Sequence, residues 1–222
     1  SRRARIVRLL PFSFREYLSF TAGAALPPLS LRSALTEPIP PDHRLATGRF
    51  DDYLQGGLHP FMLESGATKA LFENILTKIV TGDIPRFDPT LSTEELDRIH
   101  KVMRFIGRSP VDGINYSSVA RNVGITKYKA AQYLDLLERS FLLKLVFPEG
   151  SNVLKEPKVL MQLPYRLLYR DYAECIGALR EDYFVLAMEQ HSQSYAYAKT
   201  TRGGKTPDYF MRLGDQAVVV EI

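Results

Sequence analysis

The stretch that decides the fold covers residues 115–147 and reads NYSSVARNVGITKYKAAQYLDLLERSFLLKLVF. Asn115 or Ser117 can cap a short helix at its first turn, and Gly124 can end that helix in a tight turn. Thr126 can then cap a second, longer helix. The apolar side chains of this second helix recur with the helical period, at Ala130, Ala131, Leu134 and Leu137. The stretch therefore predicts two consecutive helices joined by a tight turn.

A strand and a turn follow these helices, and a further helix precedes them. Residues 141–147 are apolar apart from Lys144 and prone to form a β-strand, and residues 148–152 carry Pro, Gly, Ser and Asn, which favour a turn. Upstream, Ser92 and Glu95 have the spacing of a capping box that begins a helix. Elements in this order are typical of a winged helix-turn-helix, which we predict over residues 93–156.

The second helix of such a motif binds DNA through polar and basic side chains at its beginning, which reach base edges and phosphates. Four side chains of this kind lie on the second helix and one on the helix before it: Lys127, Tyr128, Lys129, Gln132 and Arg121. The net charge of +4 and the pI of about 9.1 permit nucleic-acid binding without requiring it. Double-stranded DNA is therefore one expected partner. The alternative is a winged helix that binds proteins or acts as a spacer, since exposed helix faces commonly carry lysines.

The residues before the winged helix are predicted to be mostly helical, with one long irregular segment. Residues 5–9 read as a short strand, and Ser13 has the spacing of a second capping box. Residues 22–48 are rich in Pro, Gly and Ala, which favours a long surface segment without regular structure. Apolar residues recur with a helical period from 68 to 80, and Gly82 is expected to end that helix.

After Pro157 the pattern changes to strands and one helix. Strands are predicted at 158–161, 195–198, 207–213 and 217–222, with a helix from 179 to 190 between the first two. Gly214 and Asp215 are expected to turn the chain between the last two strands. The pattern indicates an α/β segment.

Three acidic residues of this segment form a candidate metal site. Asp208 begins one predicted strand, Glu221 lies on its hairpin partner, and Glu181 lies on the preceding helix. Carboxylates that converge in this way can bind Mg²⁺, which activates water for phosphodiester hydrolysis. A lysine two residues after Glu221 would face the same side of the strand, and the sequence given stops at Ile222. The three residues are therefore predicted as catalytic and metal-binding, against the plainer alternative of a turn aspartate and surface glutamates.

A second interpretation of the same region, a phosphate-binding loop, is excluded by spacing. Gly204, Lys205 and Thr206 resemble the end of such a loop, whose first glycine would fall at Lys199. The loop must also open a helix, whereas Pro207 opens a predicted strand. Gly203 and Gly204 are therefore assigned to a turn.

The order of these motifs resembles the prokaryotic AAA-type ATPases that carry a C-terminal DUF4143 domain. The similar motifs lie at residues 5–18, 53–57, 79–86, 116–137 and 157–159. The resemblance implies four parts: the end of an ATPase core (1–25), a helical lid and linker (26–92), the winged helix (93–156) and a partial, restriction-endonuclease-like DUF4143 domain (157–222). It also implies ATP binding by a core whose phosphate-binding loop is absent from this sequence, so no ATPase activity is expected from the chain itself.

These observations predict a mixed α and α/β fold and two classes of function. The first is DNA binding by the winged helix, beside a nuclease-like domain that is either Mg²⁺-dependent or inactive. The second is a non-enzymatic module for protein interaction or homo-oligomerisation, or a winged-helix transcription regulator.

Composition restricts both the cysteine chemistry and the cellular location that the protein can have. The single cysteine, Cys175, excludes an internal disulfide framework and is expected to be a small buried side chain. No apolar run is long enough to span a bilayer and no signal peptide is recognisable, so we expect a cytoplasmic protein without a membrane partner. Both ends read as interrupted strands, from which we expect a piece of a longer chain.

Overall fold

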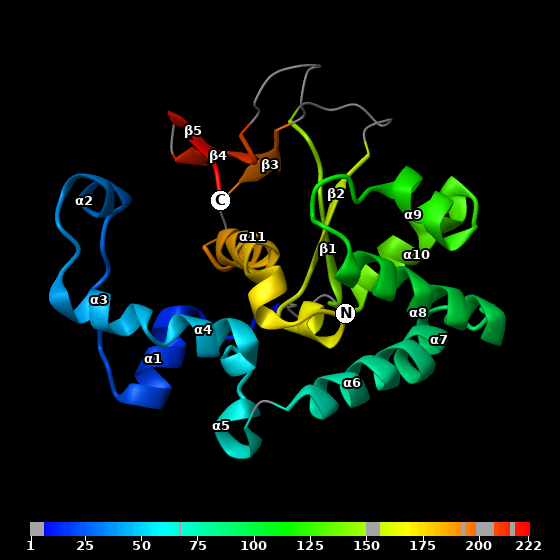
Figure 1. Ribbon diagram of the computed structural model, residues 1–222, viewed down its shortest axis with the longest axis horizontal. Helices are drawn as coiled ribbons and strands as arrows, with labels where there is room; N and C mark the ends of the chain where they lie inside the picture. Colours follow the sequence, from blue (N-terminus) through cyan, green and yellow to red (C-terminus); the bar gives the residue numbers. More distant parts are fainter. Residues whose placement is uncertain (1–6, 67, 150–155, 192–193, 199–206, 214–215) are drawn as a thin grey trace, which may run out of the picture. The chain divides into compact units, whose positions relative to one another are not determined.

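The computed structural model of the chain is drawn in Figure 1, and the chain forms two compact units. Unit 1 covers Ser1–Ala67 and unit 2 covers Thr68–Ile222. The structure describes residues 7–66, 68–149, 156–191, 194–198, 207–213 and 216–222. The turns predicted at 203–204 and 214–215, and residues 150–152 of the turn predicted at 148–152, lie outside these ranges. Helices and small antiparallel sheets make the described fold mixed α and β, as predicted.

Unit 1 is built of short helices around an aromatic core. Its described elements are α1 (Phe14–Ala22), α2 (Leu31–Thr36), α3 (Pro41–Thr47), α4 (Phe50–Asp52), the π-helical segment η1 (Tyr53–Gly57) and α5 (Met62–Ser65). Ser13 caps α1 and Glu16 completes the capping box, as predicted. The buried rings of Tyr17 and Tyr53 pack with their centroids 5.6 Å apart, which holds α1 against η1.

Two predictions for unit 1 are wrong. Residues 22–48, expected to lack regular structure, contain α2 and α3. Ser30 caps α2, and Pro41 lies in the first turn of α3, where a proline costs no hydrogen bond because that N–H has no helical partner. Residues 7–9, the described part of the predicted first strand, have no regular structure, and Leu9 is 90% exposed. Pro41 therefore marks the beginning of a helix, whereas Pro27, Pro28 and Pro38 lie in stretches without regular structure.

Unit 2 contains the longer helices and the strands. Its described helical elements are α6 (Lys69–Lys78), π-helical η2 (Ile79–Asp83), α7 (Ile84–Phe87), α8 (Thr93–Arg108), α9 (Tyr116–Val123), α10 (Lys127–Arg139), the 3-10 segment η3 (Tyr165–Leu168) and α11 (Tyr172–Gln190). Its described strands are β1 (Leu143–Val146), β2 (Lys158–Met161), β3 (Tyr195–Tyr197), β4 (Tyr209–Leu213) and β5 (Gln216–Val220).

The helix boundaries of unit 2 follow the predicted caps, but two predicted boundaries are wrong: the helix expected from residue 179 begins at Tyr172, and Gly82 ends no helix. Ser92, Asn115 and Thr126 cap α8, α9 and α10, and Gly124 ends α9 in a left-handed conformation with φ 73°. Gly82 does not end a helix as predicted, because the chain continues from α6 through η2 into α7. Gly82 therefore lies inside a helical run.

The described strands form two small antiparallel sheets. β1 pairs with β2, and β4 lies between β3 and β5, with Tyr209 opposite both Tyr197 and Val220. A parallel bridge between Pro148 and Tyr197 connects the end of β1 to β3. The boundary predicted at residue 157 thus falls between the two strands of one hairpin.

A shared core joins α11 to both sheets. Its buried members are Val111, Val146, Leu160, Val185 and Tyr209. Figure 1 shows α11 alongside β1 and β2. Cys175 on the same helix is a buried free thiol, as predicted. This packing fixes α11 relative to the strands that carry the charged residues described below.

A buried ion pair connects four segments of unit 2. Arg166 of η3 donates from Nε to Oδ2 of Asp182 of α11 at 2.7 Å and from Nη2 to Oδ1 at 3.0 Å. Asp182 also accepts the N–H of Met161 at 3.0 Å, and Arg166 donates to the carbonyl of Ile106 at 3.2 Å. The two side chains are 1% and 0% exposed. Burial raises the pKa of Asp182, and the contacts to Arg166 and Met161 oppose that shift.

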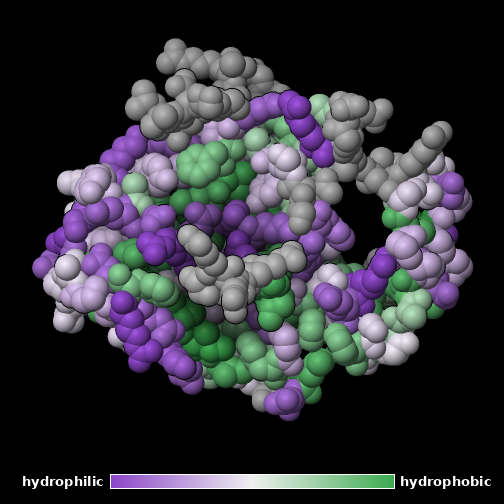
Figure 2. All heavy atoms as spheres, turned by 180° about the vertical axis from the view of Figure 1, so that it is seen from behind, coloured by the Kyte–Doolittle hydropathy of each residue, from purple (hydrophilic) through white to green (hydrophobic). Residues whose placement is uncertain are grey.

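The described surface carries both polar and apolar side chains. The face drawn in Figure 2 mixes hydrophilic and hydrophobic residues. Large apolar or aromatic side chains that are more than half exposed are Val7, Leu9, Phe20, Leu45, Phe87, Tyr128, Phe141 and Val219. Within the described ranges, no helix has the length and apolar character needed to cross a bilayer.

Candidate functional site

Three carboxylates from separate segments of unit 2 meet at one place. Among the described side chains, one oxygen each of Asp112, Glu181 and Asp208 lies within 4.8 Å of the other two. Asp112 lies in the loop before α9, Glu181 lies within α11, and Asp208 directly precedes β4. The fold therefore gathers three oxygen ligands of the kind that Mg²⁺ and related cations prefer.

The backbone of the three-stranded sheet fixes Asp208. Its N–H donates to the carbonyl of Val220 at 3.0 Å, and its carbonyl accepts the N–H of Ala198 at 3.0 Å. Its Oδ2 also accepts the N–H of Ile222 at 2.9 Å. The position of this carboxylate thus follows from the pairing of β3, β4 and β5.

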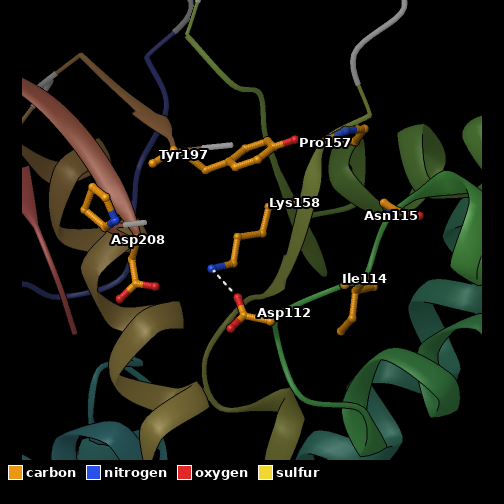
Figure 3. A pocket seen from close by; sticks show the side chains of 10 residues that line it. Asp112, Ile114, Asn115, Pro157, Lys158, Tyr197 and Asp208 are labelled. Atoms are coloured by element: carbon orange, nitrogen blue, oxygen red, sulfur yellow. Dashed lines mark ion pairs between the residues drawn. The ribbon is translucent and has the colours of Figure 1, made fainter. Parts of the chain in front are cut away.

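A lysine lies among the carboxylates. Lys158 begins β2, and its Nζ contacts Oδ1 of Asp112 at 3.1 Å and Oε1 of Glu181. Figure 3 shows this ammonium group between the carboxylates of Asp112 and Asp208. The side chain is 10% exposed, and its Nζ lies 5.1 Å from the ring centroid of Tyr209. Burial lowers the pKa of Lys158, but Glu181 and Asp112 outweigh it, so the pKa is raised and the ammonium stays charged.

Glu181 lies deepest of the three carboxylates. Its side chain is 12% exposed, and Oε1 accepts the hydroxyl of Tyr209 at 2.7 Å. Burial raises the pKa of Glu181, although Lys158 and Tyr209 oppose the shift. Burial and the charge of Glu181 also raise the pKa of Tyr209, so its hydroxyl stays protonated and donates. With all three carboxylates ionised, the cluster and Lys158 together carry an excess of two negative charges, which matches a divalent cation.

A cavity of about 380 Å³ opens beside the carboxylates (Figure 3). Residues that line it include Asp112, Asn115, Lys158, Tyr197 and Asp208. Asn115 is the N-cap of α9. The cavity therefore reaches from the carboxylates to the beginning of the helix pair α9–α10.

The structure brings together two of the three acidic residues predicted from the sequence. Glu181 and Asp208 belong to the cluster. Glu221 lies beyond the last paired residue of β5, is exposed, and is not in the cluster found among the described side chains. Sequence reasoning missed Asp112, because an aspartate before Gly113 reads as an ordinary turn pair. It also missed Lys158, which had only been assigned to a strand.

The side chains predicted to contact DNA lie at the beginning of α10 and on α9, and two of them have ionic partners within the chain. Lys127 Nζ contacts Glu156 Oε1 at 2.5 Å, and Lys129 Nζ contacts Glu95 Oε1 at 2.6 Å. The other three are exposed: Tyr128, Gln132 and Arg121. The first turn of α10 is therefore less positive than its sequence indicates.

The Glu95 pair makes a pH-dependent contribution to stability. Hydrogen bonds from Lys129 and from the N–H of Ser92, with other contacts, lower the pKa of Glu95 from 4.5 to about 2. Because the folded-state pKa is depressed, the stabilisation is present above the ordinary pKa of 4.5 and is lost as the pH falls toward 2. Glu95→Gln is expected to remove about 1 kcal/mol at neutral pH and less in acid.

Urea unfolding of wild type and Glu95→Gln across this pH range checks the expectation. The two stability curves should converge as the pH falls toward 2. Parallel curves would show that the titration of Glu95 does not contribute to the acid sensitivity of the fold.

Comparison with known proteins gives a family and one curated relative. A family model described as a domain of unknown function, DUF8612, matches residues 47–162. The uncharacterized protein MJ1637 of Methanocaldococcus jannaschii is 25% identical over 232 residues, which cover 92% of this chain and 48% of the relative. The chain thus spans about half the length of that relative. No solved structure matches the chain.

These findings correct the resemblance inferred from motif order. The matching family model is DUF8612 and not DUF4143, and the relative provides no evidence of an AAA-type ATPase. The expectation of ATP binding rested on that resemblance alone and loses this support. The matched region includes Asp112 and Lys158 and ends before Glu181 and Asp208.

Proposed function

We infer the activity from the candidate site, because the chain belongs to the DUF8612 family, whose model describes a domain of unknown function. We propose that unit 2 binds a divalent cation and, with it, acts on a phosphodiester of a nucleic acid. One observation carries the proposal. Asp112, Glu181 and Asp208 converge from three segments, and their charge exceeds that of Lys158 by two.

The chemistry of the cluster fits Mg²⁺ or Mn²⁺. Both cations take carboxylate oxygens and keep water molecules as further ligands. Such a cation lowers the pKa of a bound water and neutralises charge that develops on a phosphoryl oxygen. Lys158 would add a second positive charge at the edge of the cavity, where it can stabilise the same oxygen.

Nucleic acid is the favoured substrate because the cavity lies beside a helix pair. α8, α9 and α10, followed by the hairpin β1–β2, have the element order of a winged helix-turn-helix. Glu181 on a helix, followed by three antiparallel strands with Asp208 at the start of the middle one, supports a nuclease-like arrangement. A duplex bound at α9 and α10 would place its backbone near the carboxylates.

Calorimetric titration with Mn²⁺ tests the cation site. We expect wild type to bind the ion, and Asp112→Asn and Asp208→Asn each to weaken binding at least about tenfold, because even outer-shell partners of metal sites contribute factors of about 10 to 100. Glu174→Gln is the matched control, since Glu174 is an exposed carboxylate on the helix that carries Glu181. Glu221→Gln should also bind like wild type, because Glu221 lies outside the described cluster.

Cleavage of a labelled DNA duplex in Mg²⁺ or Mn²⁺ tests the hydrolytic activity that we propose. Cleavage that EDTA stops and that Asp208→Asn abolishes would support hydrolysis. Cation binding without cleavage would contradict hydrolysis and restrict the proposed function to DNA binding. Absence of Mn²⁺ binding, or equal weakening by Glu174→Gln and Asp208→Asn, would contradict the proposal and favour a protein-interaction module.

A further inference from the structure

Glu156 is held between the first turns of α9 and α10, which together form the α9–α10 junction. Its Oε2 accepts the backbone N–H of Ser117 at 3.0 Å, and its Oε1 accepts the hydroxyl of Ser117 at 2.5 Å. The ammonium of Lys127 lies 2.5 Å from the same Oε1. The backbone carbonyl of Glu156 accepts the hydroxyl of Tyr197 at 2.8 Å, which fixes the main chain at this point. One carboxylate is thus held by an amide, a hydroxyl and an ammonium group.

This donor set is the one with which proteins bind a backbone phosphate of nucleic acid. An amide in the first turn of a helix, a serine hydroxyl and a lysine are typical phosphate contacts that position a protein on a duplex. Ser117 lies in the first turn of α9, and Lys127 is the first residue of α10. In a helix-turn-helix these are the helix ends that approach the DNA backbone.

The positive charge of Lys127 is paired with the carboxylate of Glu156 in the same chain. Burial opposes the ionisation of Glu156, but the hydrogen bonds from Lys127 and Ser117 outweigh it and lower its pKa, so the carboxylate is charged at neutral pH. Lys129, two residues further into α10, is paired with Glu95. Two lysines at the beginning of α10 are therefore each paired with a carboxylate of the same chain.

We propose that the Glu156 carboxylate is an intramolecular substitute for a backbone phosphate of double-stranded DNA and that it restrains DNA binding at the α9–α10 junction. DNA must displace this carboxylate to reach Ser117 and Lys127. The inference rests on the DNA-binding half of the proposed function. It adds a phosphate subsite and an autoinhibitory contact that are separate from the carboxylate cluster.

The subsite and the cation site are adjacent along the chain. Glu156 is two residues before Lys158, and Pro157 between them lines the cavity. A strand of DNA that replaces the Glu156 carboxylate would therefore pass close to Asp112 and Lys158. Displacement of Glu156 would place a neighbouring phosphodiester within reach of the cation site.

Fluorescence anisotropy with a short labelled duplex, in EDTA so that the duplex stays intact, tests the proposal. Glu156→Gln keeps an oxygen for the Ser117 N–H and removes the negative charge. It is expected to bind the duplex about tenfold more tightly than wild type at low salt, with a salt dependence steeper by about one phosphate contact. Lys127→Met added to Glu156→Gln should abolish that gain. Glu174→Gln makes the same charge change at an exposed position of α11 and should give a much smaller gain.

The outcomes separate the two proposals. If wild type binds DNA and Glu156→Gln binds no more tightly than Glu174→Gln, the phosphate subsite is wrong and DNA binding stands. If neither wild type nor Glu156→Gln binds DNA, the subsite and the DNA half of the proposed function are both overturned, and Mn²⁺ binding is judged separately. Thermal unfolding of each variant confirms that the affinities compare folded proteins.

Discussion

Asp182→Asn is expected to lower the free energy of unfolding by about 3–5 kcal/mol, the cost of removing one member of a buried ion pair. The change keeps the size of the side chain. It leaves the guanidinium of Arg166, which is 1% exposed, without its counter-charge. It also replaces one of the two carboxylate oxygens that accept from Arg166 by an NH₂ group, which cannot accept, whereas the remaining oxygen can still accept the N–H of Met161.

Urea unfolding of wild type and variant measures this loss. Asp135→Asn is the matched control, because Asp135 pairs with Arg139 at 3.8 Å with both side chains 61% exposed, and such pairs contribute at most about 1 kcal/mol. The double variant Arg166→Met with Asp182→Leu should lose less than Asp182→Asn alone, since it leaves no unpaired buried charge. Equal losses for Asp182→Asn and Asp135→Asn would contradict the structural role of the pair.

Lys158→Met is expected to destabilise the cation-free protein by about 3 kcal/mol, and Mn²⁺ is expected to reverse part of the loss. The substitution removes the ammonium group that faces Asp112 and Glu181, and Glu181 is only 12% exposed. The remaining carboxylates then attract a divalent cation more strongly than in wild type. At a free Mn²⁺ concentration of 100 times Kd, binding to the folded state alone contributes about 2.7 kcal/mol.

Thermal unfolding with and without Mn²⁺ checks this expectation. Lys144→Met is the matched control, because Lys144 is also mostly buried and contacts two carboxylates, Glu138 at 3.6 Å and Glu189 at 2.6 Å. Both variants should lose stability in EDTA, but Mn²⁺ should stabilise Lys158→Met more than Lys144→Met. The same response to Mn²⁺ in both variants would mean that Lys158 does not occupy the region of a cation site.

The resemblance to an ATPase family failed because it rested on short local motifs. Capping boxes, glycine pairs and prolines at segment ends occur in many helical proteins, because they satisfy the same backbone groups in all of them. Their order along residues 5–159 was not specific to one family. The same kind of local reasoning misread residues 22–48, where a proline begins a helix.

Local backbone chemistry let the sequence by itself determine where most elements of unit 2 begin and end. Ser92, Asn115 and Thr126 cap helices because a side-chain oxygen accepts an N–H three residues later, a contact that needs no distant partner. Glu181 and Asp208 were found because helix and strand periodicity already placed them in neighbouring elements. These features depend on residues that are close in sequence.

Only the tertiary structure decided which distant side chains meet. Asp112 joins the cluster because the loop before α9 packs against α11 and β2, and Lys158 enters it from β2. From the sequence alone Lys127 is a cation without an evident partner, whereas in the fold its ammonium group contacts Glu156. Such contacts depend on the direction of single side chains across packed elements. No local pattern encodes that direction, so the charge of the site could not be read from the sequence.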